Sequence, residues 1–178
     1  MARHIVLLRG INLGSRNRIA MPALREALEE AGFEDVRTYL QSGNVVLTSK
    51  DSRQKVALAC ERLIARKFKL EIAVVVRTRS ALAKVVERNP LADVAKNPKR
   101  YQVSFLEGKP SAATLKKLEA AAAPSERVVH VGSEIYAWHP EGVARSKLWT
   151  LLAGPGLGVT ATSRNWTTVT KLLELADG

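Results

Sequence analysis

The stretch "DVRTYLQSGNVVLTS", residues 35–49, contains the pattern that decides the fold. Residues 35–40 and 45–49 are rich in apolar and β-branched side chains, and the "QSGN" between them has the glycine–asparagine chemistry of a tight turn. The stretch therefore predicts two strands joined as a β-hairpin. Which fold this hairpin belongs to depends on the residues that precede and follow it.

The residues on each side of the hairpin predict one further strand and one helix. Before it, "HIVLLR" (4–9) is a compact apolar run typical of a buried strand, and a helix begins at Pro22 and ends at Gly32. After it, a helix from about 52 to 68 precedes the strand "LEIAVVVRT" (70–78). The order strand, helix, strand, strand, helix, strand is that of the ferredoxin-like split βαβ unit.

The same order of elements then follows a second time. A helix over 80–90 closes at Asn89-Pro90 and connects the two halves. Strands are predicted at 101–107, 127–131, 134–139 and 158–163, and helices at 111–123, 145–154 and 164–177. We therefore expect an α+β protein with two ferredoxin-like (βαββαβ) halves and antiparallel sheets. The expected parts are residues 1–78, a linking helix and loop over 79–98, and residues 99–178 with a C-terminal helix.

Composition gives the broad class of the protein. The chain has 178 residues, 46% of them hydrophobic, which is enough for one domain or two small ones. Its net charge of +11 creates a field that attracts phosphates, polynucleotides or acidic surfaces. A diffuse charge that only keeps the protein soluble fits the same composition equally well. Cys60 is the single cysteine, and no apolar run suits a signal peptide or a membrane span, so we expect a cytoplasmic protein.

The expected topology brings two polar segments of the first half together. Its first two strands run parallel, with the third inserted antiparallel between them. The loop after the first strand, "RGINLGSRNR" (9–18), and the "QSGN" turn (41–44) then lie at the same end of the sheet. The candidate ligand-binding residues at this end are Arg9, Asn12, Gln41, Ser42 and Asn44.

The second half is expected to gather a similar set. Two predicted helix starts, in "ARSKL" (144–148) and "TSRNW" (162–166), lie at one end of the second sheet. The candidates there are Arg145, Ser146, Lys147, Thr162, Arg164 and Asn165, with Ser163 beside them. Helix starts that carry hydroxyls and cations suit phosphate or carboxylate groups. In the alternative interpretation, Ser146 and Ser163 only cap their helices and the cations are solvated.

Other motifs with known chemistry are absent from the sequence. It has no dinucleotide-binding fingerprint, Walker A loop, nucleophile elbow, paired cysteines or helical His-Glu pair. His4, His130 and His139 show no spacing typical of metal ligands. We therefore predict no metal and no cofactor, and no catalytic residue is singled out. The strands "HIVLLR" and "NVVLTS" carry no aromatic residue, which argues against base stacking on the sheet but not against phosphate contacts.

The motifs taken together resemble a known family. They are "LLRGINLGSRNRIAM" (7–21), "YLQSGNVV" (39–46), "VVVRT" (74–78), "ARSKL" and "TATSRNWTTVTKLLEL" (160–175). They are similar to those of a bacterial family of uncharacterised proteins, defined only as a domain of unknown function. The resemblance spans nearly the whole chain and implies two ferredoxin-like halves, but no activity. The family's motif residues fall on the two polar clusters and on Gly10 and Gly43, while Ala144 stands where the family has glycine.

Three functions fit these observations. The first is binding of a phosphate-bearing ligand such as a nucleotide or nucleic acid. Its charge would be neutralised by Arg9, Arg145, Lys147 and Arg164, with Asn12, Gln41, Asn44 and Asn165 orienting it. The second is an enzyme acting on a small phosphorylated or carboxylated metabolite, which requires a carboxylate or histidine in the polar cleft. The third is an interaction module whose basic face meets an acidic partner.

Overall fold

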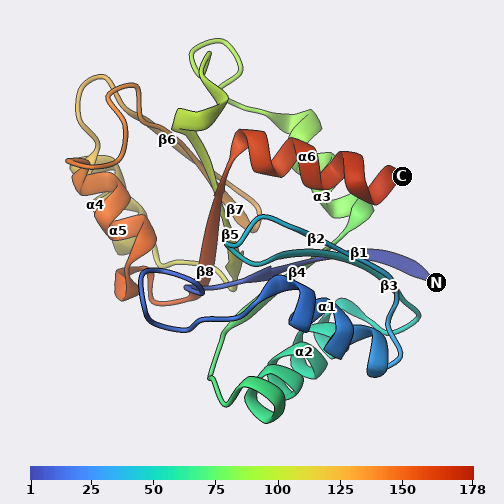
Figure 1. Cartoon of the computed structure of the whole chain (residues 1–178). Coiled ribbons are helices and arrows are strands. Elements are labelled where there is room, and N and C mark those ends of the chain that lie inside the picture. Colours follow the sequence, from blue (N-terminus) through green and yellow to red (C-terminus); the bar gives the residue numbers. More distant parts are fainter. The chain divides into compact units, whose positions relative to one another are not determined.

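A computed structural model describes all residues, 1–178, and contains two four-stranded antiparallel sheets (Figure 1). The chain divides into two compact units: unit 1 is residues 1–84 and 171–178, and unit 2 is residues 85–170. The unit boundaries therefore fall within two helices, α3 (Arg79–Arg88) and α6 (Trp166–Asp177). The ranges expected from the sequence instead placed 79–84 in the linker and 171–178 in the second half.

Unit 1 contains the hairpin from which the sequence argument began. Its elements are β1 (Ala2–Leu8), α1 (Met21–Glu30), β2 (Glu34–Tyr39), β3 (Asn44–Ser49), α2 (Arg53–Phe68) and β4 (Val74–Thr78). The strand order is β2-β3-β1-β4, and every neighbouring pair is antiparallel. This is the ferredoxin-like arrangement, which confirms the predicted α+β fold for the first half.

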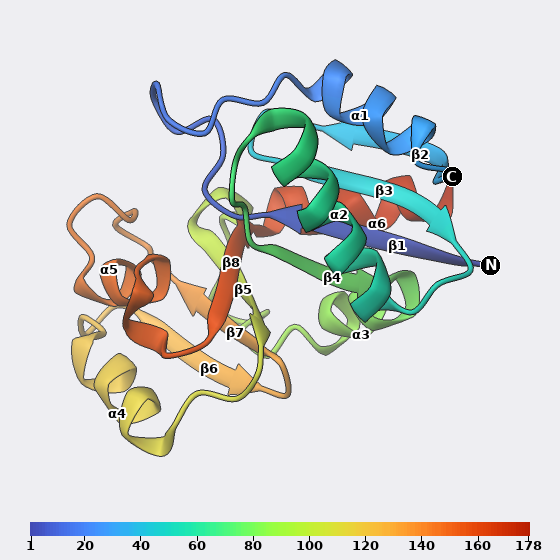
Figure 2. The same ribbon diagram turned by 90° about the horizontal axis from the view of Figure 1, so that it is seen from below.

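The core of unit 1 lies between one face of this sheet and the helices α1 and α2. Alternate strand residues such as Val6 and Leu47 point to this face and pack against Leu24 of α1 and Ile64 of α2. Pro22 occupies the first turn of α1, and Ser52 caps α2 by accepting a hydrogen bond from the Lys55 main-chain N–H at 3.3 Å. Figure 2 shows α1 and α2 side by side over the strands.

Unit 2 repeats the same arrangement. Its elements are β5 (Tyr101–Glu107), α4 (Ala112–Ala121), β6 (Arg127–Val131), β7 (Glu134–Trp138), α5 (Lys147–Ala153) and β8 (Thr160–Asn165), with short 3₁₀ turns at Pro98–Arg100 and Pro155–Leu157. The strand order is β6-β7-β5-β8, again antiparallel throughout. A core of residues such as Leu106, Leu118 and Leu148 joins the sheet to α4 and α5.

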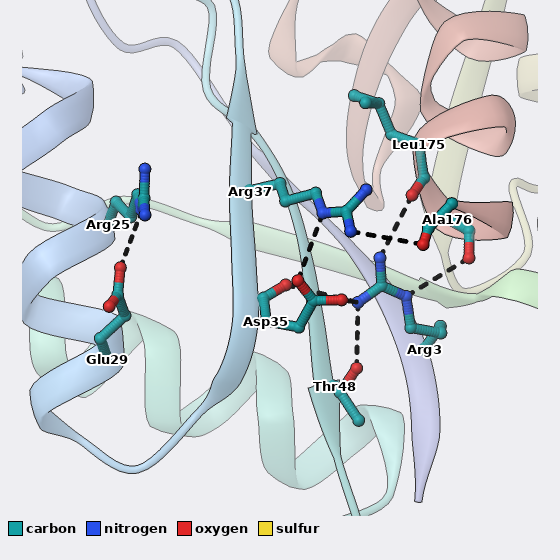
Figure 3. A network of polar contacts seen from close by, with 9 residues as sticks. Arg3, Arg25, Glu29, Asp35, Arg37, Thr48, Leu175 and Ala176 are labelled. Carbon is teal, nitrogen blue, oxygen red and sulfur yellow. Dashed lines mark hydrogen bonds and ion pairs between the residues drawn. The ribbon is translucent and has the colours of Figure 1, made fainter.

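The end of α6 is fastened to the sheet of unit 1. The guanidinium of Arg3, on β1, donates to the main-chain oxygens of Leu175 and Ala176 at 3.2 and 3.3 Å (Figure 3). It also contacts Asp35 at 2.7 Å and Thr48 at 3.0 Å, so one side chain joins three strands to the helix. The last turn of α6 contains no basic residue of its own, and Arg3 therefore supplies the positive charge that a helix C-terminus favours. None of the helices combines the length and the apolar character needed to cross a membrane.

Candidate functional site

Hydrogen bonds of the Asn12 side chain hold the polar loop after β1 in its conformation. Its side-chain oxygen accepts from the Ile19 N–H at 2.8 Å, while its Nδ2 donates to the carbonyl oxygens of Ile19 and Gln41 at 2.8 and 2.7 Å. The loop after β1 and the β2–β3 turn therefore meet, as the topology predicts. The amide of Asn12 is occupied by these contacts, so its role is to join two loops.

Asn44 and Gly43 hold the main chain of the β2–β3 turn in place. Asn44 is fully buried, and its Nδ2 donates to Tyr39 O at 2.9 Å and to Ser42 Oγ at 3.0 Å. The carbonyl oxygen of Gly43 accepts a hydrogen bond from the Leu8 N–H at 2.9 Å. Arg9 directly follows β1 and is partly buried, with its main-chain N–H bound to Ala73 O at 2.9 Å. This end of unit 1 thus brings Asn12 to Gln41 and Asn44 to Ser42, and the side-chain amides of both asparagines are occupied by contacts within the two loops.

The predicted residues Arg145, Ser146 and Lys147 lie together in a pocket of unit 2. The pocket has a volume of about 770 Å³ and is lined by Ala120–Ala123, Ser125, Glu126, Glu141, Gly142, Ala144, Arg145, Ser146 and Lys147. We call it the unit 2 pocket. The side chains of Arg145 and Lys147 are exposed and make no hydrogen bond or ion pair within the chain. Two cations without an ion-pair partner therefore flank Ser146 in the sequence, and the carboxylates of Glu126 and Glu141 line the same pocket.

A buried polar cluster lies against the unit 2 pocket. The Oε2 atom of Glu126 is 2.6 Å from Ser146 Oγ and 2.6 Å from His139 Nδ1, while its Oε1 accepts from the Ala123 N–H at 3.0 Å. All three residues are at most 9% exposed. Ser146 also caps α5 by accepting from the Trp149 N–H at 3.0 Å. The cluster fastens the segment before β6, the end of β7 and the start of α5 to one another.

Electrostatics keep the Glu126 carboxylate ionised. Burial acts to raise its pKa, but the hydrogen bonds from Ala123, Ser146 and His139 together outweigh burial and hold the pKa below its ordinary value. Because an ionised carboxylate only accepts hydrogen bonds, we assign the proton of this contact to His139 Nδ1. The Nε2 atom of His139 has no hydrogen-bond partner, and its ring meets Trp149 edge-on at 5.8 Å between centroids.

The cluster does not have the geometry of a Ser-His-Asp triad. In a triad, the hydroxyl binds one histidine nitrogen and the carboxylate binds the other. Here Ser146 Oγ and the Glu126 carboxylate both face Nδ1 of His139, with Oγ and Nδ1 3.4 Å apart. A proton cannot pass from the hydroxyl through the ring to the carboxylate in this arrangement.

The second predicted helix start differs from the expectation. Residues 164 and 165 belong to β8, and α6 begins at Trp166 with Asn165 Oδ1 accepting from the Thr168 N–H at 2.9 Å. Ser163 therefore caps no helix; its hydroxyl is 2.6 Å from that of Ser104 on β5. Since neighbouring strand residues point to opposite faces, Thr162 and Arg164 face away from the side of α4 and α5. Arg164 is buried there and donates to Thr162 Oγ1 at 2.7 Å, and burial lowers its pKa to about 10.

Comparison with known proteins identifies the family. The family model described as a protein of unknown function, DUF1697, matches residues 1–136. The chain belongs to the DUF1697 family. Its structure is similar to that of a conserved bacterial protein from Streptococcus pneumoniae, with a TM-score of 0.80 and 24% sequence identity over 98% of each chain. No curated protein matches the chain. At this identity the structural similarity establishes the fold alone, with two ferredoxin-like halves.

Sequence reasoning about this DUF1697 protein missed Glu126. The residue follows Pro124-Ser125 in a short turn between α4 and β6, where an acidic side chain is ordinarily a solvated charge. Its partners lie 13 and 20 residues further along the chain, so only the folded structure brings them together. From the sequence, the spacing of His139 indicated only that it is not a typical metal ligand. No group of three or more His, Cys, Asp or Glu side chains is arranged to hold a metal ion.

Proposed function

We propose that the protein binds a small phosphate-bearing ligand in the unit 2 pocket. The single observation that carries this proposal is the pair Arg145 and Lys147, two unpaired cations that line one cavity of about 770 Å³. A volume of this size suits a nucleotide-sized molecule. The guanidinium of Arg145 can bind two phosphate oxygens at once, while Lys147 adds a mobile point charge.

The buried cluster supports the proposal by fixing the main chain that carries the two cations. Ser146 lies between Arg145 and Lys147 and is held by Glu126 and by its own helix. A fixed main chain at this point reduces the entropy lost when a ligand binds. The ionised Glu126 also repels any ligand phosphate placed deep in the pocket, so the proposal positions the phosphate between the two cations rather than against the cluster.

A titration with ATP, followed by thermal unfolding and calorimetry, tests the proposal. At about 100 times its dissociation constant, a ligand stabilises the folded protein by roughly 2.7 kcal/mol, which raises the melting temperature. We expect the double variant R145A/K147A to lose this shift. The matched control is K116A/K117A, which removes the same charge from exposed, unpaired positions on α4 that do not line the pocket. An equal loss in both variants, or no shift in the wild-type protein, contradicts the proposal.

A second candidate is an enzyme, and one observation favours it: a carboxylate lines the pocket 2.6 Å from a hydroxyl. In such a reaction Ser146 Oγ would attack the phosphoryl or acyl group of an ester while its proton passes to Glu126 Oε2, and the bond to the leaving oxygen would break as the leaving alcohol takes that proton from Glu126. Hydrolysis by water would then release the group from Ser146. The lowered pKa of Glu126 makes it a weak base at neutral pH, which places this candidate second. Turnover of p-nitrophenyl phosphate or acetate that is lost in Ser146→Ala supports it, and an inactive wild-type protein excludes it for these two substrates.

A further inference from the structure

A second hollow lies in unit 1, at the opposite end of the sheet from the loop organised by Asn12. Its volume is about 530 Å³, and it opens where β2 begins and β3 ends, beside α2. Its lining includes Gly32, Phe33, Ser49, Lys50, Arg62 and Arg66. We call it the unit 1 hollow. None of the residues predicted from the sequence to bind a ligand belongs to it.

The hollow continues onto a basic face of α2. Lys55, Arg62 and Arg66 are spaced by seven and four residues, which places them on one side of the helix. With Lys50 they form a set of four exposed cations, and none of their side chains makes a hydrogen bond or an ion pair within the chain. Uncompensated cations in a row suit an extended polyanion better than a single small anion.

The hollow also offers an aromatic ring with open space around it. Phe33 is half-buried against the core of unit 1, so its position is fixed while part of the ring faces the hollow. Gly32 beside it has φ +99 and no atom within 4 Å of where a Cβ would lie, and Ala59 on α2 is equally small. A fixed ring next to a basic groove is the combination that single-stranded nucleic acids bind, because every base can stack on it.

We propose that the unit 1 hollow binds single-stranded nucleic acid, with one base stacked on Phe33 and the phosphates along Lys50, Arg62, Arg66 and Lys55. Glu34 and Asp51 also line the hollow and reduce its local charge. Their carboxylates suit the amino groups of base edges, which a simple phosphate site would not require. The proposal is independent of the unit 2 pocket.

An anionic membrane is a poorer occupant of this surface. Helices that bind membranes insert an apolar face between the lipids. The apolar residues of α2, such as Val56, Leu63 and Ile64, are buried in the core of unit 1. Leu58, 47% exposed, is the only large apolar side chain that α2 presents to solvent, and a single residue does not form an apolar face for insertion.

The test is fluorescence anisotropy with a labelled single-stranded oligo(dC) at several salt concentrations. We expect R62A/R66A to reduce the slope of log K against log salt by about 1.4, since each single-strand phosphate contact contributes about 0.7. Phe33→Leu keeps an apolar side chain in the core but removes the ring. It is expected to weaken binding roughly 5- to 150-fold, the effect of losing one stacked base, and to leave the slope unchanged.

Two controls separate this site from general charge effects. K116A/K117A on α4 removes two exposed positive charges from unit 2 and is expected to leave the slope nearly unchanged, and R145A/K147A is expected to retain oligonucleotide binding. The proposal is overturned if K116A/K117A weakens binding as much as R62A/R66A, or if Phe33→Leu has no effect. Binding to anionic vesicles or to duplex DNA alone, without binding to the single strand, also overturns it.

Discussion

At the scale of single residues, Gly43 is the position with the least room. It has φ +90, and a Cβ there would lie 2.8 Å from both Ile11 Cδ1 and Leu8 Cβ. We expect Gly43→Ala to lower the free energy of unfolding by about 1–3 kcal/mol from strained backbone alone, and by more because two core residues must move. Gly14→Ala is the control, since Gly14 has φ +64 and nothing within 4 Å. Urea unfolding gives the loss of unfolding free energy in each variant, and the difference between the two losses measures the cost of the clash at Gly43. Equal losses would show that the left-handed backbone conformation alone causes the destabilisation.

His4 makes the stability of the protein sensitive to mild acid. Its ring is buried and neither nitrogen has a hydrogen-bond partner. Burial lowers its pKa, although nearby main-chain groups of Ser49 and Asp51 and the charge of Asp51 partly oppose this. Because the folded pKa lies below that of the unfolded chain, about 6.5, the unfolded state binds the proton better. The free energy of unfolding that depends on a neutral His4 is therefore fully present above a pH of about 6.5, and it is lost as the pH falls below that value.

The substitution His4→Leu tests this dependence. A leucine cannot be protonated and fills a similar volume, so we expect a smaller change in unfolding free energy between neutral and mildly acidic pH than in the wild-type protein. Chemical denaturation across that range measures it. His130→Leu is the matched control, because that ring is only partly buried on β6 and its Nε2 has a hydrogen-bond partner, the carbonyl of Gly132, at 2.9 Å. An unchanged pH profile in His4→Leu would show that other groups cause the acid sensitivity.

At the scale of elements, the sequence predicted most strands and helices because their patterns are local. Alternating apolar residues and the "QSGN" turn are sufficient to specify the β2–β3 hairpin. The end of β8 was not predictable in this way. Arg164 and Asn165 pair with Val103 and Gln102 on β5, and this ladder extends the strand two residues beyond the expected end at 163. By its local pattern, the polar "SRN" run is typical of a helix start. Its pairing with β5, which the local pattern does not show, makes it the end of a strand instead.

The same reasoning explains how much of the candidate site was predictable. Arg145 and Lys147 belong to a run of polar residues just before an apolar helix, and this local signal led to them directly. The contact between Glu126 and Ser146 depends instead on how α5 packs beside α4, which no local pattern encodes. The capping role of Ser146 was one of the two interpretations left open, and the structure has Ser146 both as a cap and as part of the pocket lining.

The Glu126 cluster gives a prediction at this scale. Ser146→Ala removes a helix cap, at a cost of about 1 kcal/mol, and one donor to a buried carboxylate. Glu126→Gln keeps the shape but removes the charge. Because the two residues share one hydrogen bond, a double-mutant cycle is expected to give a coupling energy of about 0.5–3 kcal/mol at neutral pH. The lowered pKa of Glu126 means that this coupling is present above the ordinary carboxyl pKa and is lost as the pH falls below it. Additive effects at neutral pH would contradict a shared network.

At the scale of the whole molecule, the chain returns to unit 1 with its last eight residues. These residues carry the partners of three arginines: Arg3 binds the carbonyls of Leu175 and Ala176, Arg37 binds that of Gly178 at 3.3 Å, and Arg79 binds Asp177 at 2.6 Å. The tryptophans, by contrast, all belong to unit 2: Trp138, Trp149 and Trp166. Tryptophan fluorescence therefore reports on unit 2, while far-ultraviolet circular dichroism reports on both units.

A chain that ends at Thr170 tests whether the two units unfold separately. It lacks the segment that Arg3 and Arg79 hold, and two buried side chains, those of Leu172 and Ala176, are removed from unit 1. We expect the circular dichroism transition in urea to begin at lower concentration than in the full chain, ahead of the fluorescence transition. The Arg25→Ala variant is the control, since it breaks only an exposed i,i+4 pair with Glu29, worth about 0.3–0.5 kcal/mol. If both signals instead move together in the shortened chain, the two units unfold as one cooperative body, because the loss of a segment from unit 1 then destabilises unit 2 equally.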